Sequence, residues 1–374
     1  MSRRASGRRN GRVDSEDATK GRKGERIERV DSADATKEKM NSREKRRLLK
    51  YEELPEFLKD NEFILDYYRC EWPLKDTFLS VFSLHNETLN IWTHLGGFVI
   101  FAAMAVLSLM ENTNDDDEGS ISSFFRTNVV ATPLMTILSL HSTNSSKNSA
   151  PTDSHYIHYS RSSLLGINRA DSELLPRWPW FVFLSGAMCC LVFSSLSHLL
   201  ACHSKRLNLF FWRLDYTGIS IMIVCSFFAP VYYVFYCQPI WQLLYLTSIT
   251  IFGILSIITL LAPALSSPRF RKFRASLFLT MGFSGVIPAI HAATLHWAHS
   301  QMLIALGYEV FMGMLYAIGA GFYVSRIPER WKPGCFDLAG HSHQIFHVFV
   351  VGGALAHSVA TLIMMNWRQG SLTC

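Results

Sequence analysis

Seven long apolar runs constrain what this chain can fold into more than any other feature of its sequence. An α-helix of about 20 apolar residues crosses the ~30 Å hydrocarbon core of a bilayer, and runs near that length recur from residue 94 to residue 366. They lie at about 94–110, 179–201, 212–236, 241–262, 276–295, 302–324 and 343–366. Tryptophans near their ends are typical of the membrane–water interfaces. The sequence therefore predicts an all-α membrane protein, a seven-transmembrane helix bundle, and excludes a cytosolic enzyme, a DNA-binding domain and a disulfide-stapled secreted module.

The charged residues predict the orientation of this bundle. Residues 1–50 carry 17 of the 36 Lys and Arg but only 9 of the 30 Asp and Glu, so we expect a disordered basic tail. Every second short connection between spans is basic. The second-to-third connection contains Lys205 and Arg206, the fourth-to-fifth contains Arg269, Arg271, Lys272 and Arg274, and the sixth-to-seventh contains Arg326, Arg330 and Lys332. The alternate short connections, residues 237–240 and 296–301, contain no Lys or Arg. Because basic loops stay in the cytoplasm, we expect a cytoplasmic N-terminus and a C-terminus that is outside or lumenal, the reverse of a G-protein-coupled receptor. A basic tail before membrane spans touches anionic lipid, so we expect no nucleic-acid partner.

Composition also divides the chain into domains. Residues 51–93 alternate apolar with charged side chains, which predicts amphipathic juxtamembrane helices on the membrane surface or against the bundle. The seven-helix membrane domain takes residues 94–366 and includes a long, poorly ordered, non-cytoplasmic loop at 111–177. Residues 367–374 form a short C-terminal tail. In this topology Cys237 and Cys374 share the non-cytoplasmic side, so a disulfide between them is possible.

Ionisable residues gather at the predicted cytoplasmic ends of three spans. His198 lies near the end of one span, Asp215 near the start of the next, and His343 and His347 at the start of the last. Histidines four residues apart face one way on a helix; with His198 they would offer a metal three imidazoles and leave a fourth position for water. Zinc would lower the pKa of that water toward neutrality. Asp215 would hold the water or act as general base, and Ser194, one helical turn before His198, would donate to an oxyanion.

Other interpretations of these residues are open at this point. Histidines at helix ends also cap backbone carbonyls, although ionisable residues within spans are costly and usually functional. His341 and His357 are rival ligands, but His341 is expected in the preceding loop and His357 deeper in the membrane, as a polar core residue. His85, Glu87 and His94 are expected to close the cytoplasmic mouth of the bundle rather than to bind the metal.

Three motifs resemble those of the adiponectin receptor family, the progestin and adipoQ receptors. They are Ser-Leu-His-Asn-Glu-Thr-Leu-Asn-Ile-Trp-Thr-His-Leu at 83–95, Ser-Ser-Leu-Ser-His-Leu-Leu-Ala-Cys-His-Ser at 194–204 with Leu-Asp-Tyr-Thr-Gly-Ile at 214–219, and His-Ser-His-Gln-Ile-Phe-His-Val-Phe-Val-Val at 341–351. The resemblance implies seven helices, a cytoplasmic N-terminus and a Zn²⁺ held by His198, His343 and His347. It also implies that Asp215 lies near the metal through water.

The resemblance extends to function. Ser194 and the metal-site residues are similar to the pattern of a wider membrane hydrolase superfamily that includes alkaline ceramidases. The long 111–177 loop resembles that of the plant heptahelical transmembrane proteins, a branch linked to hormone, sugar and abiotic-stress responses. We therefore expect an adiponectin-receptor-like signalling protein with an intramembrane zinc site; the alternative is a zinc-dependent, ceramidase-like lipid amidohydrolase.

The same resemblance and composition suggest where the protein acts and with what. The expected location is an integral, multi-pass position in the plasma membrane or an endomembrane. The expected partners are a membrane lipid or a small hydrophobic ligand, and cytosolic signalling proteins that bind the N-terminal tail.

Overall fold

The computed structural model describes residues 46–111, 175–262, 265, 267–371 and 374. Within these residues the chain forms helices and no strand. Seven segments are long and apolar enough to cross a membrane, which confirms the all-α, seven-span prediction. Most of the tail predicted at 1–50 and of the loop predicted at 111–177 lies outside the described residues.

Five of the seven spans are longer than the apolar runs that predicted them, and the other two match their runs in length. They are α3 (Thr88–Glu111), α6 (Trp178–Leu200), α7 (Lys205–Val234), α8 (Pro239–Leu260), α9 (Arg271–Phe283) followed by α10 (Val286–His296), α11 (Ser300–Ser325) and α12 (Ser342–Gln369). Short elements precede α3, namely η1 (Tyr51–Glu53), η2 (Glu56–Leu58), α2 (Leu74–Leu79) and η3 (Ser80–Phe82), and η6 (Pro268–Phe270) precedes α9. At α7 the extension to Lys205 has a local cause, because the Ser204 side chain accepts a hydrogen bond from the Leu207 backbone N–H at 3.4 Å and caps the helix.

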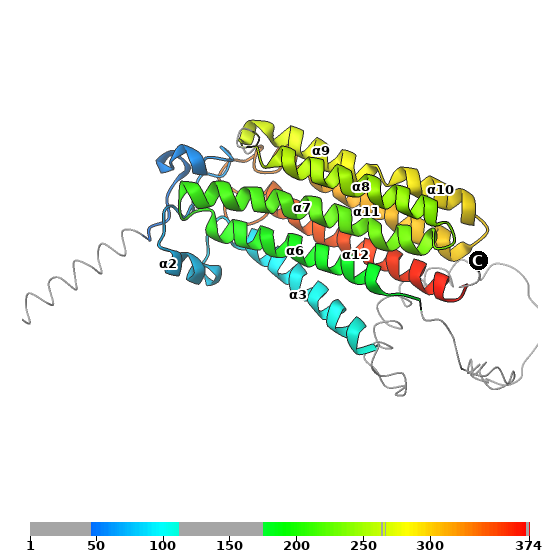
Figure 1. The fold of residues 1–374 in the computed structure, drawn as a ribbon. Helices are drawn as coiled ribbons and strands as arrows, with labels where there is room; N and C mark the ends of the chain where they lie inside the picture. Colours follow the sequence, from blue (N-terminus) through cyan, green and yellow to red (C-terminus); the bar gives the residue numbers. More distant parts are fainter. Residues whose placement is uncertain (1–45, 112–174, 263–264, 266, 372–373) are drawn as a thin grey trace, which may run out of the picture.

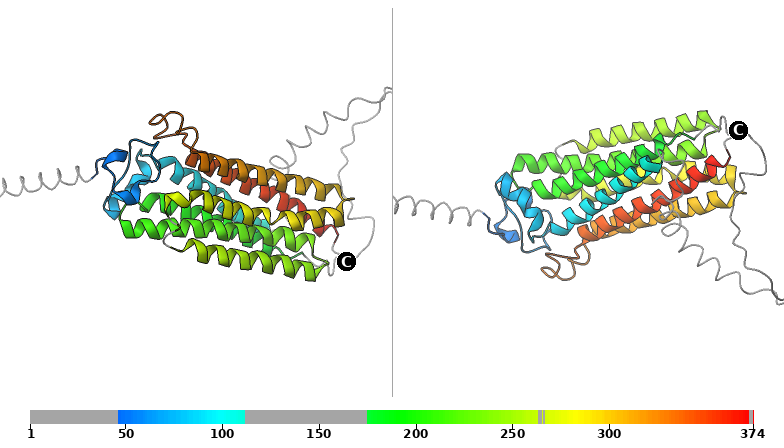
Figure 2. Two further views of the ribbon diagram at one scale, coloured as in Figure 1. Left: turned by 90° about the horizontal axis from the view of Figure 1, so that it is seen from above. Right: turned by 90° about the horizontal axis from the view of Figure 1, so that it is seen from below.

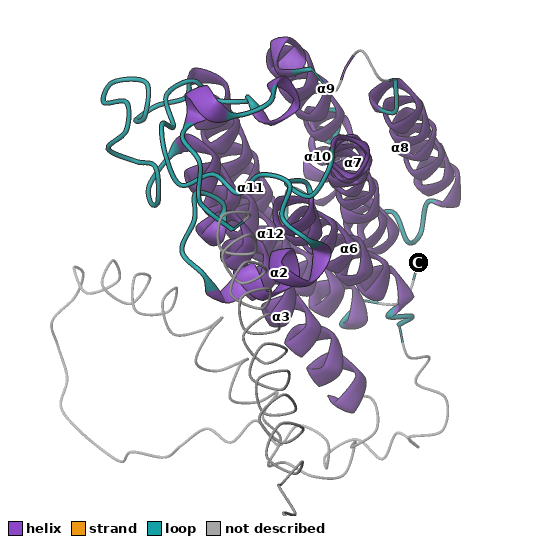
Figure 3. Ribbon diagram, turned by 90° about the vertical axis from the view of Figure 1, so that its left-hand side faces the viewer, coloured by secondary structure: helices purple, strands orange, loops and turns teal. Residues whose placement is uncertain are grey.

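Helix α12 lies inside the bundle and contacts α3, α7 and α11 (Figure 3). Helices α6 and α7 also pack tightly against each other. Gly186 of α6 lies so close to Cys225 of α7 that a Cβ placed on Gly186 would be 2.4 Å from the Cys225 Cβ. Small residues permit such close approach of helix backbones in a membrane. Helices α6 and α7 are thereby held side by side.

Residues 46–87 cover one end of the bundle, which we call the capped end (Figure 1). This segment is joined to the helices by polar contacts. Arg69, which is buried, donates to the backbone carbonyl of His198 at the end of α6, at 2.7 Å. Arg271 of α9 donates to the Asp60 carboxylate at 2.5 Å. The segment expected as juxtamembrane helices is therefore docked on the helix ends that carry the candidate site.

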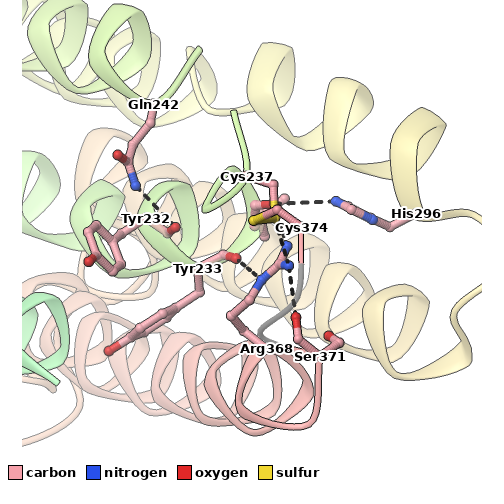
Figure 4. The surroundings of a disulfide bond; sticks show 9 residues. Tyr232, Tyr233, Cys237, Gln242, His296, Arg368, Ser371 and Cys374 are labelled. Atoms are coloured by element: carbon pink, nitrogen blue, oxygen red, sulfur yellow. Dashed lines mark hydrogen bonds between the residues drawn. A yellow bond between two sulfur atoms is a disulfide. The ribbon is translucent and has the colours of Figure 1, made fainter. Parts of the chain in front are cut away.

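The opposite end of the bundle carries the C-terminus (Figure 2), and we call it the disulfide end. The disulfide between Cys237 and Cys374 that the topology made possible is present there. Figure 4 shows Arg368 of α12 beside it: Nε donates to the carbonyl of Tyr233 at 2.8 Å and Nη2 to that of Val234 at 3.1 Å. These carbonyls belong to the last turn of α7, where the helix itself leaves them without a partner. The disulfide end therefore ties α12 to α7.

Candidate metal centre

Two helix ends bring the predicted histidines together at the capped end. His198 lies in the last turn of α6, which ends at Leu200. His343 and His347 lie in the first two turns of α12, which begins at Ser342. Because four residues make slightly more than one helical turn, the two α12 side chains project from the same face.

The three imidazoles surround a common point. One ring nitrogen from each of His198, His343 and His347 lies within 4.8 Å of the others, and the three ring centroids are 4.8–4.9 Å apart. His198 and His347 are buried, and His343 is half-buried. Among the described residues, these three histidines form the one group of His, Cys, Asp or Glu side chains whose ligand atoms lie close enough together to hold a metal ion.

Hydrogen bonds determine which ring nitrogen of His198 and which of His347 has a free lone pair. Nδ1 of His198 lies 2.7 Å from a Glu87 carboxylate oxygen, and Nδ1 of His347 lies 3.1 Å from the Asn90 carbonyl oxygen. Both oxygens are acceptors, so each Nδ1 donates and each Nε2 carries the lone pair. Nε2 of His198 is buried and has no hydrogen-bond partner. This unpaired nitrogen beside two further imidazoles fits a metal ion, and neutral imidazoles suit zinc among the transition metals.

Asp215 and Ser194 border the triad. Asp215 of α7 is buried and lies within interaction range of both His198 and Ser194. Ser194 of α6 is buried as well, one helical turn before His198. Trp212 packs edge-on against the His198 ring at a centroid distance of 5.2 Å. A carboxylate acceptor and a hydroxyl donor are thus available next to the three imidazoles.

The two rival histidines of the last span lie outside the triad. His341 immediately precedes α12, and its Nε2 is 3.3 Å from the Asn86 carbonyl oxygen. Burial lowers the pKa of His341, which keeps the ring neutral. His357 lies ten residues after His347 on α12, where its Nδ1 is 3.0 Å from the Glu309 carboxylate of α11. Each rival has a partner of its own that explains its burial.

The polar residues of the first motif surround the triad instead of completing it. His94 of α3 stacks on His347 with the ring centroids 3.6 Å apart. His85 uses both nitrogens locally, toward the Ser80 carbonyl and the Glu87 backbone N–H, each at 3.1 Å. Burial, and next the nearby Arg69, lower the pKa of His85 to about 3, so this ring is neutral.

The contact of Glu87 with His198 is the part of the site that sequence reasoning missed. The two residues are 111 positions apart, and the sequence alone indicates Glu87 only as one of a group that closes the mouth of the bundle. One signal in the sequence pointed further: Glu87 is an acidic residue within the motif at 83–95, just before the span predicted to begin at residue 94. Ionisable side chains close to the apolar core of a bundle usually pair with another polar group.

Comparisons with known proteins agree with this architecture. A family model described as Haemolysin-III related matches residues 82–358. Heptahelical transmembrane protein 3 of Arabidopsis thaliana is 57% identical over 329 residues, which cover 88% of this chain and 90% of that protein. Heptahelical transmembrane protein ADIPOR1 of Oryza sativa is 46% identical, with 87% of this chain and 86% of that protein covered. The adiponectin receptor protein of Drosophila melanogaster is 35% identical over 83% of this chain and 58% of that protein.

Proposed function

Because the chain belongs to the Haemolysin-III-related family of heptahelical, adiponectin-receptor-like membrane proteins, we propose that it is a signalling protein with a zinc site inside its helix bundle. Its seven apolar helices and its heptahelical transmembrane relatives show that it is an integral, multi-pass membrane protein. The observation that carries the zinc proposal is the meeting of His198, His343 and His347 from two helices, with the Nε2 of His198 buried and unpaired.

The residues around the triad have separate roles in this proposal. His198, His343 and His347 hold the ion, which would supply positive charge and Lewis acidity within the bundle. Asp215 accepts a hydrogen bond from a polar group that approaches the triad, and Ser194 donates one. The ligand that suits this site is a membrane lipid or small hydrophobic molecule with one polar group, because the site lies within a helix bundle whose spans are surrounded by lipid.

We assign the capped end to the cytoplasm. The basic connections, including Lys205 and Arg326, belong to that end, as basic loops of membrane proteins do on the cytoplasmic side. The disulfide between Cys237 and Cys374 lies at the other end, and disulfides persist in oxidising compartments outside the cytosol. The two observations are independent and support the same orientation. It places the basic tail in the cytosol, where it can bind signalling partners of a hormone, sugar or abiotic-stress response.

The proposal is tested by measuring zinc and lipid-amide hydrolysis on the same purified samples. The full chain should contain about one zinc per molecule, His347→Ala should lose it, and His357→Ala, which removes a buried histidine outside the triad, should keep it. The zinc-loaded protein should not hydrolyse N-acyl sphingoid lipids. Absence of zinc from the wild-type protein would refute the metal site. Zinc-dependent hydrolysis that His347→Ala abolishes would instead establish the ceramidase-like alternative.

A further inference from the structure

The loop that precedes α3 places a carboxylate directly on one of the candidate metal ligands. Glu87 is the residue before α3, and its Oε2 lies 2.7 Å from Nδ1 of His198. The His198 side chain is 1% exposed and that of Glu87 28% exposed. A carboxylate at this distance from a fully buried imidazole forms a strong, charge-assisted hydrogen bond.

Several contacts hold the Glu87 carboxylate in this position. The side-chain amide of Asn90 donates to the same Oε2 atom at 2.5 Å, and the Glu87 backbone N–H donates to His85. His85 in turn contacts the Ser80 carbonyl. The loop is therefore fixed on both sides of Glu87, and the carboxylate meets His198 in one orientation.

The capped end is also attached to the His198 backbone by a second route. Arg69 donates to the carbonyl oxygens of His198 and Leu199 and to the Ser80 hydroxyl. The same stretch of chain thus holds the end of α6 through Arg69 and the His198 ring through Glu87. Because His198 is held both at its backbone carbonyl and at its ring Nδ1, the imidazole has little freedom to turn.

We propose that Glu87 is a positioning residue of the metal centre, which holds His198 as the Nδ1–H tautomer with Nε2 directed at the ion. The chemistry is that of the carboxylate partners which orient metal-binding histidines and increase their basicity. The proposal rests on the metal site proposed above and extends that site to the start of α3. Two of the three ligands then depend on this region, because the Asn90 carbonyl of α3 accepts from Nδ1 of His347.

The chain offers a matched control for this role. Glu309 and His357 form a second carboxylate–imidazole pair between two spans, at 3.0 Å, outside the triad. Glu309→Gln therefore removes the charge from a comparable buried pair and leaves the metal ligands and Glu87 in place. Its effect measures what the loss of such a pair does to the fold alone.

The first experiment measures zinc affinity by chelator competition on the detergent-solubilised full chain, together with the visible spectrum of the Co²⁺-substituted protein. Glu87→Ala should weaken zinc binding by about 10- to 100-fold and alter the Co²⁺ spectrum. Glu87→Gln keeps an oxygen acceptor for Nδ1–H and should recover most of the affinity. Glu309→Gln should leave affinity and spectrum unchanged. Wild-type affinity in a folded Glu87→Ala protein would overturn the proposal.

A second experiment needs no bound metal, and so separates this inference from the proposed zinc site. The ¹⁵N shifts of the His198 ring in metal-stripped protein report which nitrogen is protonated. The wild-type ring should be protonated at Nδ1, and Glu87→Ala should shift the population toward the other tautomer. An unchanged tautomer in Glu87→Ala would refute the role of Glu87. If the tautomer shifts but wild-type protein binds no zinc, the zinc proposal fails and the positioning of His198 by Glu87 stands.

Discussion

At the scale of single residues, a metal held by both α6 and α12 would make the stability of the fold depend on zinc. An ion that binds only the folded chain stabilises it by about 2.7 kcal/mol at a free concentration 100 times its dissociation constant. Added zinc should therefore raise the Tm of the metal-stripped protein, and His198→Ala or His343→Ala should largely remove that increase. Thermal unfolding with and without zinc checks this. An increase of wild-type size in His198→Ala would mean that another group binds the ion.

Asp215 should behave differently from the three histidines. It is buried beside His198 but does not belong to the triad, so Asp215→Ala should retain most of the zinc. The zinc content of Asp215→Ala should be measured beside that of His343→Ala. An equal loss of zinc from both variants would show that Asp215 is a ligand. If the protein hydrolyses lipid amides, Asp215→Ala should lower the rate by about 10²- to 10⁴-fold, the range for a lost general base.

At the scale of elements, the contact between α6 and α7 tolerates no added methyl group. A Cβ on Gly186 would lie 2.4 Å from the Cβ and 2.8 Å from the Sγ of Cys225, whereas a Cβ on Gly96 of α3 would meet nothing within 4 Å. Gly186→Ala should therefore destabilise the bundle by about 1–3 kcal/mol, the usual cost of overpacking. Gly96→Ala should not. The Tm of each variant, measured by thermal unfolding in detergent, tests this prediction. Equal Tm values would show that α6 and α7 accommodate the added methyl group with no loss of stability.

The elements α2 and η3 present an apolar surface. Phe78, Leu79 and Phe82 are 51%, 56% and 81% exposed, and they lie shortly before the exposed Leu89 and Trp92 of α3. We predict that this surface lies in the membrane interface. A fluorophore attached at Phe82→Cys should be quenched by nitroxide lipids, whereas one at Glu56→Cys, whose parent side chain is 89% exposed, should not. Equal quenching at both positions, or at neither, would contradict the prediction.

At the scale of the whole molecule, seven spans place the two ends of the chain on opposite sides of the membrane. An N-terminal tag should be protected from protease in intact cells or sealed microsomes, and a C-terminal tag should be accessible from outside or only after the lumen is opened. Cys237 should react with maleimide only after reduction, because we expect its disulfide on the oxidising side of the membrane. Tags on the same side would refute the count of spans. A protected C-terminal tag together with a cleaved N-terminal tag would reverse the orientation.

Much of this architecture can be predicted from the sequence, because a segment crosses the bilayer according to its length and hydropathy. Hydropathy belongs to each residue separately, so seven apolar runs predict seven spans before any contact is known. Depth follows from position along a span. This is how His198, His343 and His347 could be grouped at one end, and how Cys237 and Cys374 could be placed together at the other. The identity of the bound metal and the ligands' roles stay predictions.

Only the tertiary structure decides which groups touch at a given depth. The sequence predicts Glu87 and His94 at the cytoplasmic mouth of the bundle and His341 in the loop before the last span, but no pattern shows which groups they contact. The fold separates them because α3 brings Glu87 onto Nδ1 of His198 and stacks His94 on His347, while His341 turns to the Asn86 carbonyl. Such contacts depend on how helices rotate and cross, and that is set by the packing of small residues such as Gly186. Hydropathy therefore determines the spans and their depth, and side-chain packing alone determines the geometry of the site.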